Sequence, residues 1–363
     1  MVAIVGSRSQ EDIKGYVLNR AYQSYRQPGS CIKPLNVYTP YLQLGNTPDT
    51  KVTDSQIDGG PANADASYAG EMTLTDAVKW SKNTVAWNIY QQITPKTGSS
   101  FLIKMGFHKI WVDKDYNAGA LGGFTYGVTT EEMAGGYAAL ANDGVYRKAT
   151  CIRLIVNASN KTVVNETNRD SKVYDKSASR MMTQMLREVV LSGTGTSANV
   201  ENAVVAGKTG TTNASKDVWF CGYSKYYTTT VWAGYDYPKE MSGVNSRVNA
   251  IFKDFMTAVH TNLPVTDFST VTQQTTQPET TAAVQEETES LPQETTAIVP
   301  ETTGIEQVTP QQVPSTTAQV PTTTPYQRWT TAPAQPKTTA PMQYGDIDAT
   351  TRTDPDATAR GEW

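Results

Sequence analysis

A serine and a lysine stand three residues apart in the stretch RQPGSCIKPL, directly after a Pro-Gly pair. Residues three apart are neighbours on a helix, so the amine of Lys33 can reach the hydroxyl of Ser30. Burial lowers the pKa of a lysine, and the neutral amine can then take the proton of a serine nucleophile. The N–H of Ser30, at the helix start, is also placed to donate to an oxyanion. On this stretch alone, a helix-capping Ser30 followed by a solvated Lys33 is the alternative interpretation.

A second motif, Ser81-Lys82-Asn83, adds two polar side chains that suit the same chemistry. Side chains two apart in a loop can both point into one cleft. There Ser81 could relay a proton to a leaving amine, and Asn83 could bind a substrate amide. A Ser-x-Asn tripeptide is common by chance, so it gains meaning only beside the other motifs.

The third motif is Lys208-Thr209-Gly210, followed by Thr211, in a stretch of strand character. On a strand, Lys208 and Gly210 project to one face, and Thr209 and Thr211 to the other. Lys208 supplies positive charge for a carboxylate or for tuning the serine, and the two threonine hydroxyls can bind a carboxylate. Gly210 would let a substrate backbone approach closely. A phosphate loop is excluded, because its first glycine would fall at Asn202.

Composition narrows the classes of protein further. The chain has 363 residues, a formal net charge of -4 and no Lys/Arg-rich run, so nucleic acid is not an expected partner. Its 3 cysteines lack any CxxC and predict neither a disulfide framework nor a zinc site. The 2 histidines lie in no context that suggests a Ser-His-Asp triad. No secretory signal begins the chain, and no apolar run approaches the roughly 20 residues of a membrane span.

Helix-type and strand-type patterns alternate before residue 263, and they must position the three motifs. A capping box is expected near Thr130. The order favours an α+β fold, a layered α/β/α domain with an antiparallel sheet flanked by helices. The predicted helical stretches are 30–45, 73–94, 129–144 and 177–195, and the predicted strands are 1–7, 203–212, 218–224 and 227–236.

The set S-x-x-K, S-x-N and K-T-G, in this order, is shared by penicillin-binding proteins and class A β-lactamases. Over roughly residues 2–262 the chain resembles the transpeptidase domain of a bifunctional (class A) penicillin-binding protein. The likeness is carried by LNRAYQSYRQPGSCIKP, DAVKWSKNTVAWNIYQQI and VAGKTGTTNASKDVWFCGYSKYYTTTVWAGYD. It implies D,D-transpeptidation of peptidoglycan stem peptides in the cell envelope, acylation by β-lactams, and no metal or cofactor.

The resemblance also implies the roles of the acylation residues. Ser30 would attack the carbonyl of the penultimate D-Ala, and Lys33 would be the base. Ser81 would pass a proton to the departing D-Ala, with Lys208 nearby. The N–H groups of Ser30 and Thr211 would form the oxyanion hole.

The implied binding residues surround these groups. Asn83 would hold the substrate amide, and Thr209 and Thr211 would bind the terminal carboxylate, beside Gly210. A stem-peptide amine would then release the acyl-enzyme and make a crosslink. D,D-carboxypeptidase action uses the same residues and remains open.

Composition changes near residue 263, where Thr, Pro, Gln and Glu take over. We predict an N-terminally truncated transpeptidase domain over 1–262 and a disordered Thr/Pro/Gln/Glu-rich tail over 263–363. Full members of the family carry a membrane helix and a glycosyltransferase domain ahead of this domain. The competing hypothesis is therefore a non-catalytic or degenerate fragment that binds peptidoglycan or a partner.

Overall fold

Three consecutive antiparallel strands between residues 206 and 234 form most of the central sheet. The computed structural model describes residues 2–3, 18–152, 154–165 and 170–270. Strands β8 (Ala206–Thr211), β9 (Asp217–Tyr223) and β10 (Thr228–Gly234) are antiparallel neighbours in the order β10-β9-β8. Within the predicted strand 1–7, β1 (Val2–Ala3) pairs with β10 in parallel, and the remainder of that strand lies outside the described residues.

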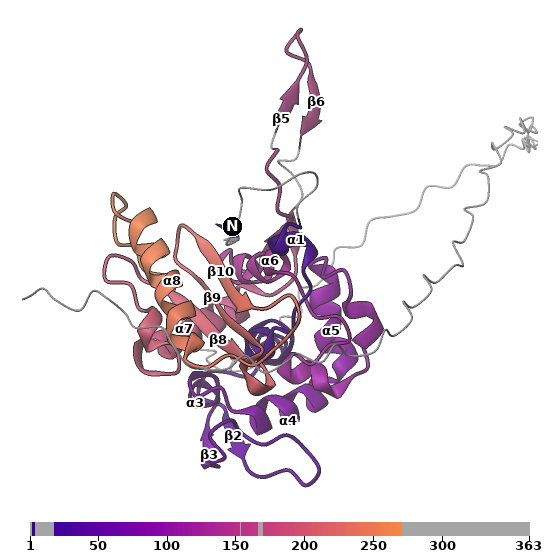
Figure 1. The fold of residues 1–363 in the computed structure, drawn as a ribbon, viewed down its shortest axis with the longest axis vertical. Coiled ribbons are helices and arrows are strands. Elements are labelled where there is room, and N and C mark those ends of the chain that lie inside the picture. Colours follow the sequence, from indigo (N-terminus) through magenta and orange to yellow (C-terminus); the bar gives the residue numbers. More distant parts are fainter. Residues whose placement is uncertain (1, 4–17, 153, 166–169, 271–363) are drawn as a thin grey trace, which may run out of the picture. The chain divides into compact units, whose positions relative to one another are not determined.

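Strand β9 is buried along its whole length because helices cover both faces of the sheet (Figure 1). Trp219, Cys221 and Tyr223 pack in one apolar cluster with α6 (Thr130–Ala141) and α7 (Lys176–Ser192). Val218 and Phe220 point the other way, as the two-residue period of a strand requires, into a cluster with α8 (Val244–Val259). The result is the layered arrangement that the pattern predicts.

A helical region lies beside the sheet and carries the first two motifs (Figure 1). Its helices and those of the N-terminal segment are α1 (Arg20–Gln23), α2 (Thr39–Leu42), α3 (Leu74–Lys79), α4 (Asn83–Ile93) and α5 (Pro95–Lys104). Short 3-10 helices span Ile110–Asp113, Asn117–Leu121, Thr196–Ala198 and Asn213–Ser215. Three two-stranded sheets pair β2 (Lys51–Asp54) with β3 (Gly70–Thr73), β4 (Val145–Arg147) with β7 (Asp170–Lys172), and β5 (Leu154–Val156) with β6 (Thr162–Asn165). Within the described residues, no helix has the length and apolarity to cross a bilayer.

The helix predicted over 30–45 is helical but changes pitch along its length. It begins as a 3-10 turn at Gly29–Ile32, continues as a π-helix at Pro34–Tyr38 and ends as α2. Two prolines without N–H groups, Pro34 and Pro40, interrupt the regular hydrogen-bond ladder.

The capping box of α6 lies one residue before the predicted position. Thr129 Oγ1 accepts from the N–H of Glu132 at 3.1 Å, and Glu132 Oε2 accepts from the N–H of Thr129 at 2.8 Å. The threonine and glutamate required by this motif stand three apart at these positions, whereas Thr130 is followed three residues later by Met133.

The chain divides into two units, Met1–Thr280 and Thr281–Trp363, and the second lies outside the described residues. The predicted tail therefore stays a prediction beyond residue 270. Residues 263–270 are described, and they contact the domain. Phe268 stacks edge-on against Tyr223 with ring centroids 5.5 Å apart, and Arg187 Nη1 lies 2.8 Å from Asp267 Oδ1.

Candidate active site

The turn that carries Ser30 lies against the end of β8 because two glycines leave room for it. Gly29 has a φ of +51°, and a Cβ there would stand 2.9 Å from the carbonyl oxygen of Thr211. A Cβ at Gly210 would stand 2.5 Å from the carbonyl oxygen of Pro28. At Gly210 the missing side chain makes room for the chain's own turn, and the predicted approach of a substrate backbone there stays a prediction. The backbone of the Ser30 turn therefore packs directly against the backbone of β8 at Thr211.

The amine of Lys33 is fully buried and is held by the second motif. Nζ donates to the carbonyl of Ser81 at 2.8 Å and to Oδ1 of Asn83 at 2.7 Å, with the carbonyl of Lys82 at 3.4 Å. A neutral amine has two N–H bonds and one lone pair, so the two short contacts can use both protons. Burial first, and the charge of Lys208 second, hold the pKa of Lys33 well below its usual value.

Among the described residues, Ser30 Oγ makes no hydrogen bond to Lys33 Nζ. The amine donates to residues 81–83 instead, so the predicted role of Lys33 as the base for Ser30 stays a prediction. Both residues still belong to one short helical turn beside β8.

The Ser81 motif forms the end of α3 and the start of α4. The N–H of Ser81 donates to the carbonyl of Val78 at 3.1 Å, and that of Lys82 to the carbonyl of Ala77 at 2.9 Å. This is a Schellman ending, whose left-handed position usually holds glycine. Ser81 occupies it with a φ of +59°. A side chain is therefore kept at a strained position at the edge of the cleft.

Replacing Ser81 by glycine should stabilise the fold, because glycine adopts this conformation without the Cβ clash. We expect the free energy of unfolding in urea to rise by about 1 kcal/mol. Ser81→Ala is the matched control, since it also loses the hydroxyl but keeps the Cβ. Equal stabilities of the two variants would show that Ser81 carries no backbone strain.

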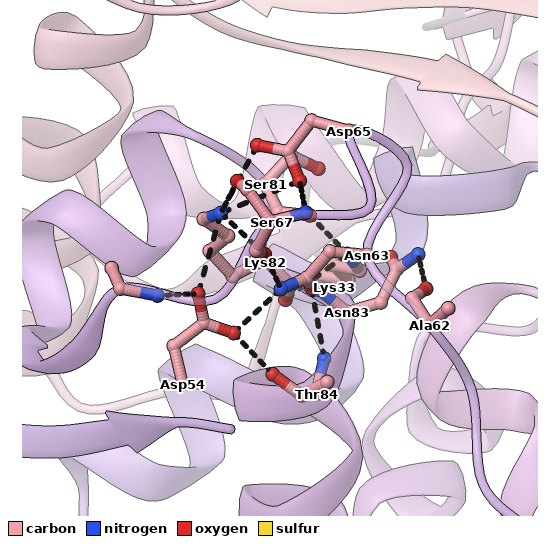
Figure 2. A network of polar contacts seen from close by, with 11 residues as sticks. Lys33, Asp54, Ala62, Asn63, Asp65, Ser67, Ser81, Lys82, Asn83 and Thr84 are labelled. Atoms are coloured by element: carbon pink, nitrogen blue, oxygen red, sulfur yellow. Dashed lines mark hydrogen bonds and ion pairs between the residues drawn. The ribbon is translucent and has the colours of Figure 1, made fainter. Parts of the chain in front are cut away.

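Asn83 begins α4, and its side-chain amide is occupied at both ends (Figure 2). Oδ1 accepts from Lys33, and Nδ2 donates to the carbonyl of Ala62 at 2.9 Å. The backbone N–H of Asn83 donates to Oδ1 of Asn63 at 2.7 Å. Sequence reasoning missed Asn63 and the neighbouring Asp54, because isolated polar residues far from a motif carry no spacing signal.

Lys208 lies on β8, across the cleft from the Ser81 motif, and its side chain is fully buried beneath the cleft surface. Its Nζ donates to the carbonyl of Thr209 at 3.2 Å, and within the described part of the chain it forms no ion pair with a carboxylate. Burial lowers the pKa of Lys208 to about 8. Thr209 Oγ1 lies 2.8 Å from Thr194 Oγ1, and Thr211 Oγ1 donates to Asn245 Oδ1 at 3.2 Å.

These walls enclose a cleft of about 1050 Å³. Five predicted site residues line it, namely Ser30, Ser81, Asn83, Thr209 and Thr211, whereas Lys33, Lys208 and Gly210 lie behind its surface. A hydroxyl, a buried amine and a nearly unpaired cation with threonine hydroxyls are what acylation of a substrate carrying a carboxylate requires. No group of metal-ligating side chains occurs among the described residues.

A family model described as the penicillin binding protein transpeptidase domain matches residues 1–257. The chain is 34% identical over 251 residues to penicillin-binding protein 4 of Bacillus subtilis, which covers 68% of this chain and 40% of that protein. It is 36% identical over 282 residues to penicillin-binding protein 1A of Aquifex aeolicus, which covers 73% of this chain and 37% of that protein. The chain thus spans less than half the length of these relatives.

Solved structures share the fold. Penicillin-binding protein 1A from Haemophilus influenzae matches with a TM-score of 0.58 and 25% identity, over 69% of this chain and 45% of that chain. The PonA1 protein from Mycobacterium tuberculosis in complex with penicillin V matches with a TM-score of 0.60 and 21% identity, over 70% and 73% of the two chains. The predicted fold class is confirmed by these neighbours.

Proposed function

The chain belongs to the family of penicillin-binding protein transpeptidase domains, and from this membership we propose that it is a peptidoglycan D,D-transpeptidase that works through an acyl-serine. Its substrates are stem peptides that end in D-Ala-D-Ala, and β-lactams acylate the same serine as mimics of that dipeptide. The reaction takes place in the cell envelope.

Acylation begins at Ser30. Its Oγ attacks the carbonyl carbon of the penultimate D-Ala, and the hydroxyl proton moves to the lone pair of Lys33. The N–H groups of Ser30 and Thr211 stabilise the oxyanion that develops on the carbonyl oxygen. The peptide bond then breaks, and the proton that Lys33 took from Ser30 passes through the hydroxyl of Ser81 to the amine of the departing D-Ala.

The D-Ala carboxylate is bound on the opposite wall. Lys208 carries the positive charge, and the hydroxyls of Thr209 and Thr211 donate hydrogen bonds to the carboxylate oxygens. Asn83 holds the amide of the stem peptide. The amine of a second stem peptide then attacks the acyl-enzyme, which forms the crosslink and frees Ser30.

One observation carries this proposal. All the hydrogen-bond acceptors of the buried Lys33 amine come from the S-x-N motif, and the second buried lysine, Lys208, has no carboxylate partner among the described residues. The lowered pKa of Lys33 favours proton abstraction, and the charge that Lys208 keeps below about pH 8 favours carboxylate recognition.

Labelling with a fluorescent penicillin, followed by peptide mapping, tests the proposal. We expect one adduct per chain, on Ser30. Incubation with a D-Ala-D-Ala pentapeptide should release D-Ala, and an added acceptor amine should give a crosslinked product. Release without crosslinking would indicate a carboxypeptidase. A folded protein without any adduct would support the non-catalytic fragment instead, which the family match does not favour.

The pH dependence of the acylation rate should be bell-shaped. The rate rises with pH as Lys33 loses its proton, and this limb lies well below the usual pKa of lysine because burial and Lys208 disfavour the charged form. It falls as pH passes about 8, where Lys208 loses the charge that binds the carboxylate. The second-order acylation constant, measured at low penicillin concentration, reports these free-enzyme groups. A rate that keeps rising above pH 9 would contradict the role of Lys208.

A further inference from the structure

A single buried carboxylate organises the segment that folds over the Ser81 motif (Figure 2). Asp54, the last residue of β2, is fully buried. Its Oδ1 accepts from Thr84 Oγ1 at 2.5 Å and from Asn63 Nδ2 at 2.6 Å. Its Oδ2 accepts from the N–H of Ala69 at 2.9 Å and lies 3.3 Å from Lys82 Nζ. Every oxygen of this carboxylate is thus tied to the residues around the motif.

Lys82, the middle residue of the motif, is the cationic partner. Its amine is 3.1 Å from Asp65 Oδ2 and also donates to Oγ of Ser67 at 3.1 Å. Burial alone would raise the pKa of Asp54, but hydrogen bonds from Thr84 and Asn63 hold it below its usual value. Asp65 and Asp54 raise the pKa of Lys82 against the effect of its burial. The pair is therefore ionised at neutral pH.

Asn63 fixes the start of α4. Lys82 occupies the N-cap position but gives no side-chain cap. Asn63 Oδ1 accepts from the N–H of Asn83 at 2.7 Å and of Thr84 at 3.3 Å, so it caps the helix from another segment. Its Nδ2 is held in turn by Asp54.

The same turn supplies both short-range acceptors of the Lys33 amine, the carbonyl of Ser81 and Oδ1 of Asn83. We propose that Asp54, Asn63 and Lys82 are positioning residues for acylation, which hold those two acceptors and thereby fix the position and orientation of the Lys33 amine. This inference rests on the proposed acyl-serine function. A motif with φ +59° at Ser81 needs such support, because the strained turn would otherwise relax.

The test separates positioning from folding stability. The double variant Asp54→Asn with Lys82→Met removes both charges, so no lone buried charge remains to unfold the protein. We expect the first-order acylation constant at saturating penicillin to fall about tenfold to a hundredfold, because small misplacements of a catalytic group have such effects. The concentration for half-saturation should change less than twofold. All rates are expressed per active site, counted by complete labelling.

Two further variants complete the experiment. Lys82→Arg keeps the cation and should restore the first-order constant to within about threefold of the wild type. Arg180→Met removes a different ion pair, in which Nε of Arg180 on α7 lies 2.9 Å from Oδ1 of Asp143, and should lower the melting temperature without changing either acylation constant. An unchanged first-order constant in the double variant, with wild type labelled on Ser30, overturns this inference alone. Folded wild type that is never labelled overturns the proposed function and this inference together.

Discussion

Ser30→Ala should abolish covalent labelling by penicillin and release of D-Ala, while the protein stays folded. Removal of a nucleophile leaves no atom that can form the acyl-enzyme, and such losses reach about a millionfold. Ser30 is half-buried, and its hydroxyl makes no hydrogen bond among the described residues. The free energy of unfolding should therefore change by less than about 0.5 kcal/mol.

Urea unfolding measures the stability of the variant, and gel fluorescence measures its covalent labelling by the fluorescent penicillin. Ser100→Ala is a suitable control, because Ser100 is a helical serine away from the cleft whose hydroxyl donates to the carbonyl of Thr97 at 2.7 Å. It should be labelled like the wild type. Labelling that persists in Ser30→Ala would mean that another residue is the nucleophile, and the assignment of the first motif would be wrong.

Lys208→Met should stabilise the fold and impair acylation at the same time. The pKa of Lys208 is lowered from 10.5 to about 8 by burial, so the charged form is disfavoured in the folded state. The folded pKa lies below the unfolded one, so wild-type stability rises as pH increases from about 8 to 10.5. At pH 7 the variant lacks this penalty and should gain about 3 kcal/mol.

Acylation by Lys208→Met should require at least about a hundredfold more penicillin, because the carboxylate loses its charged partner. The fall of the acylation rate above about pH 8, which belongs to Lys208, should disappear. The limb that belongs to Lys33 should move to higher pH, since Lys208 no longer disfavours the Lys33 cation. Urea unfolding at pH 7 and pH 10 measures the change in stability, and the pH dependence of the acylation rate measures the change in the two limbs. Lys253→Met, on the exposed side of α8, is the control. A variant with wild-type stability at pH 7 would contradict the buried cation.

Local patterns were sufficient to predict the layers, and they pointed to residues that the structure brings to one cleft, whose catalytic roles stay a prediction. The β-branched and aromatic run from Val218 to Cys221 predicts a strand, and the structure confirms it, with apolar clusters packed on both of its faces. The three motifs predict one cleft, and five of their residues line it. Asp54 and Asn63 could not be found this way, because they act through contacts across 20 to 30 positions of sequence. The change from 3-10 to π-helix after Gly29 depends on prolines within the helix. The spacing of apolar residues predicts a helix there but cannot distinguish one helix type from another.

The contact between Asn83 Nδ2 and the carbonyl of Ala62 has a consequence for binding. If Asn83 holds the stem-peptide amide as proposed, the Ala62 carbonyl occupies that place in the resting cleft, and the peptide must displace it before its own carbonyl can bind. That exchange would consume part of the binding energy and weaken association with the donor peptide. Selectivity would then reside in the acylation step and not in the initial binding.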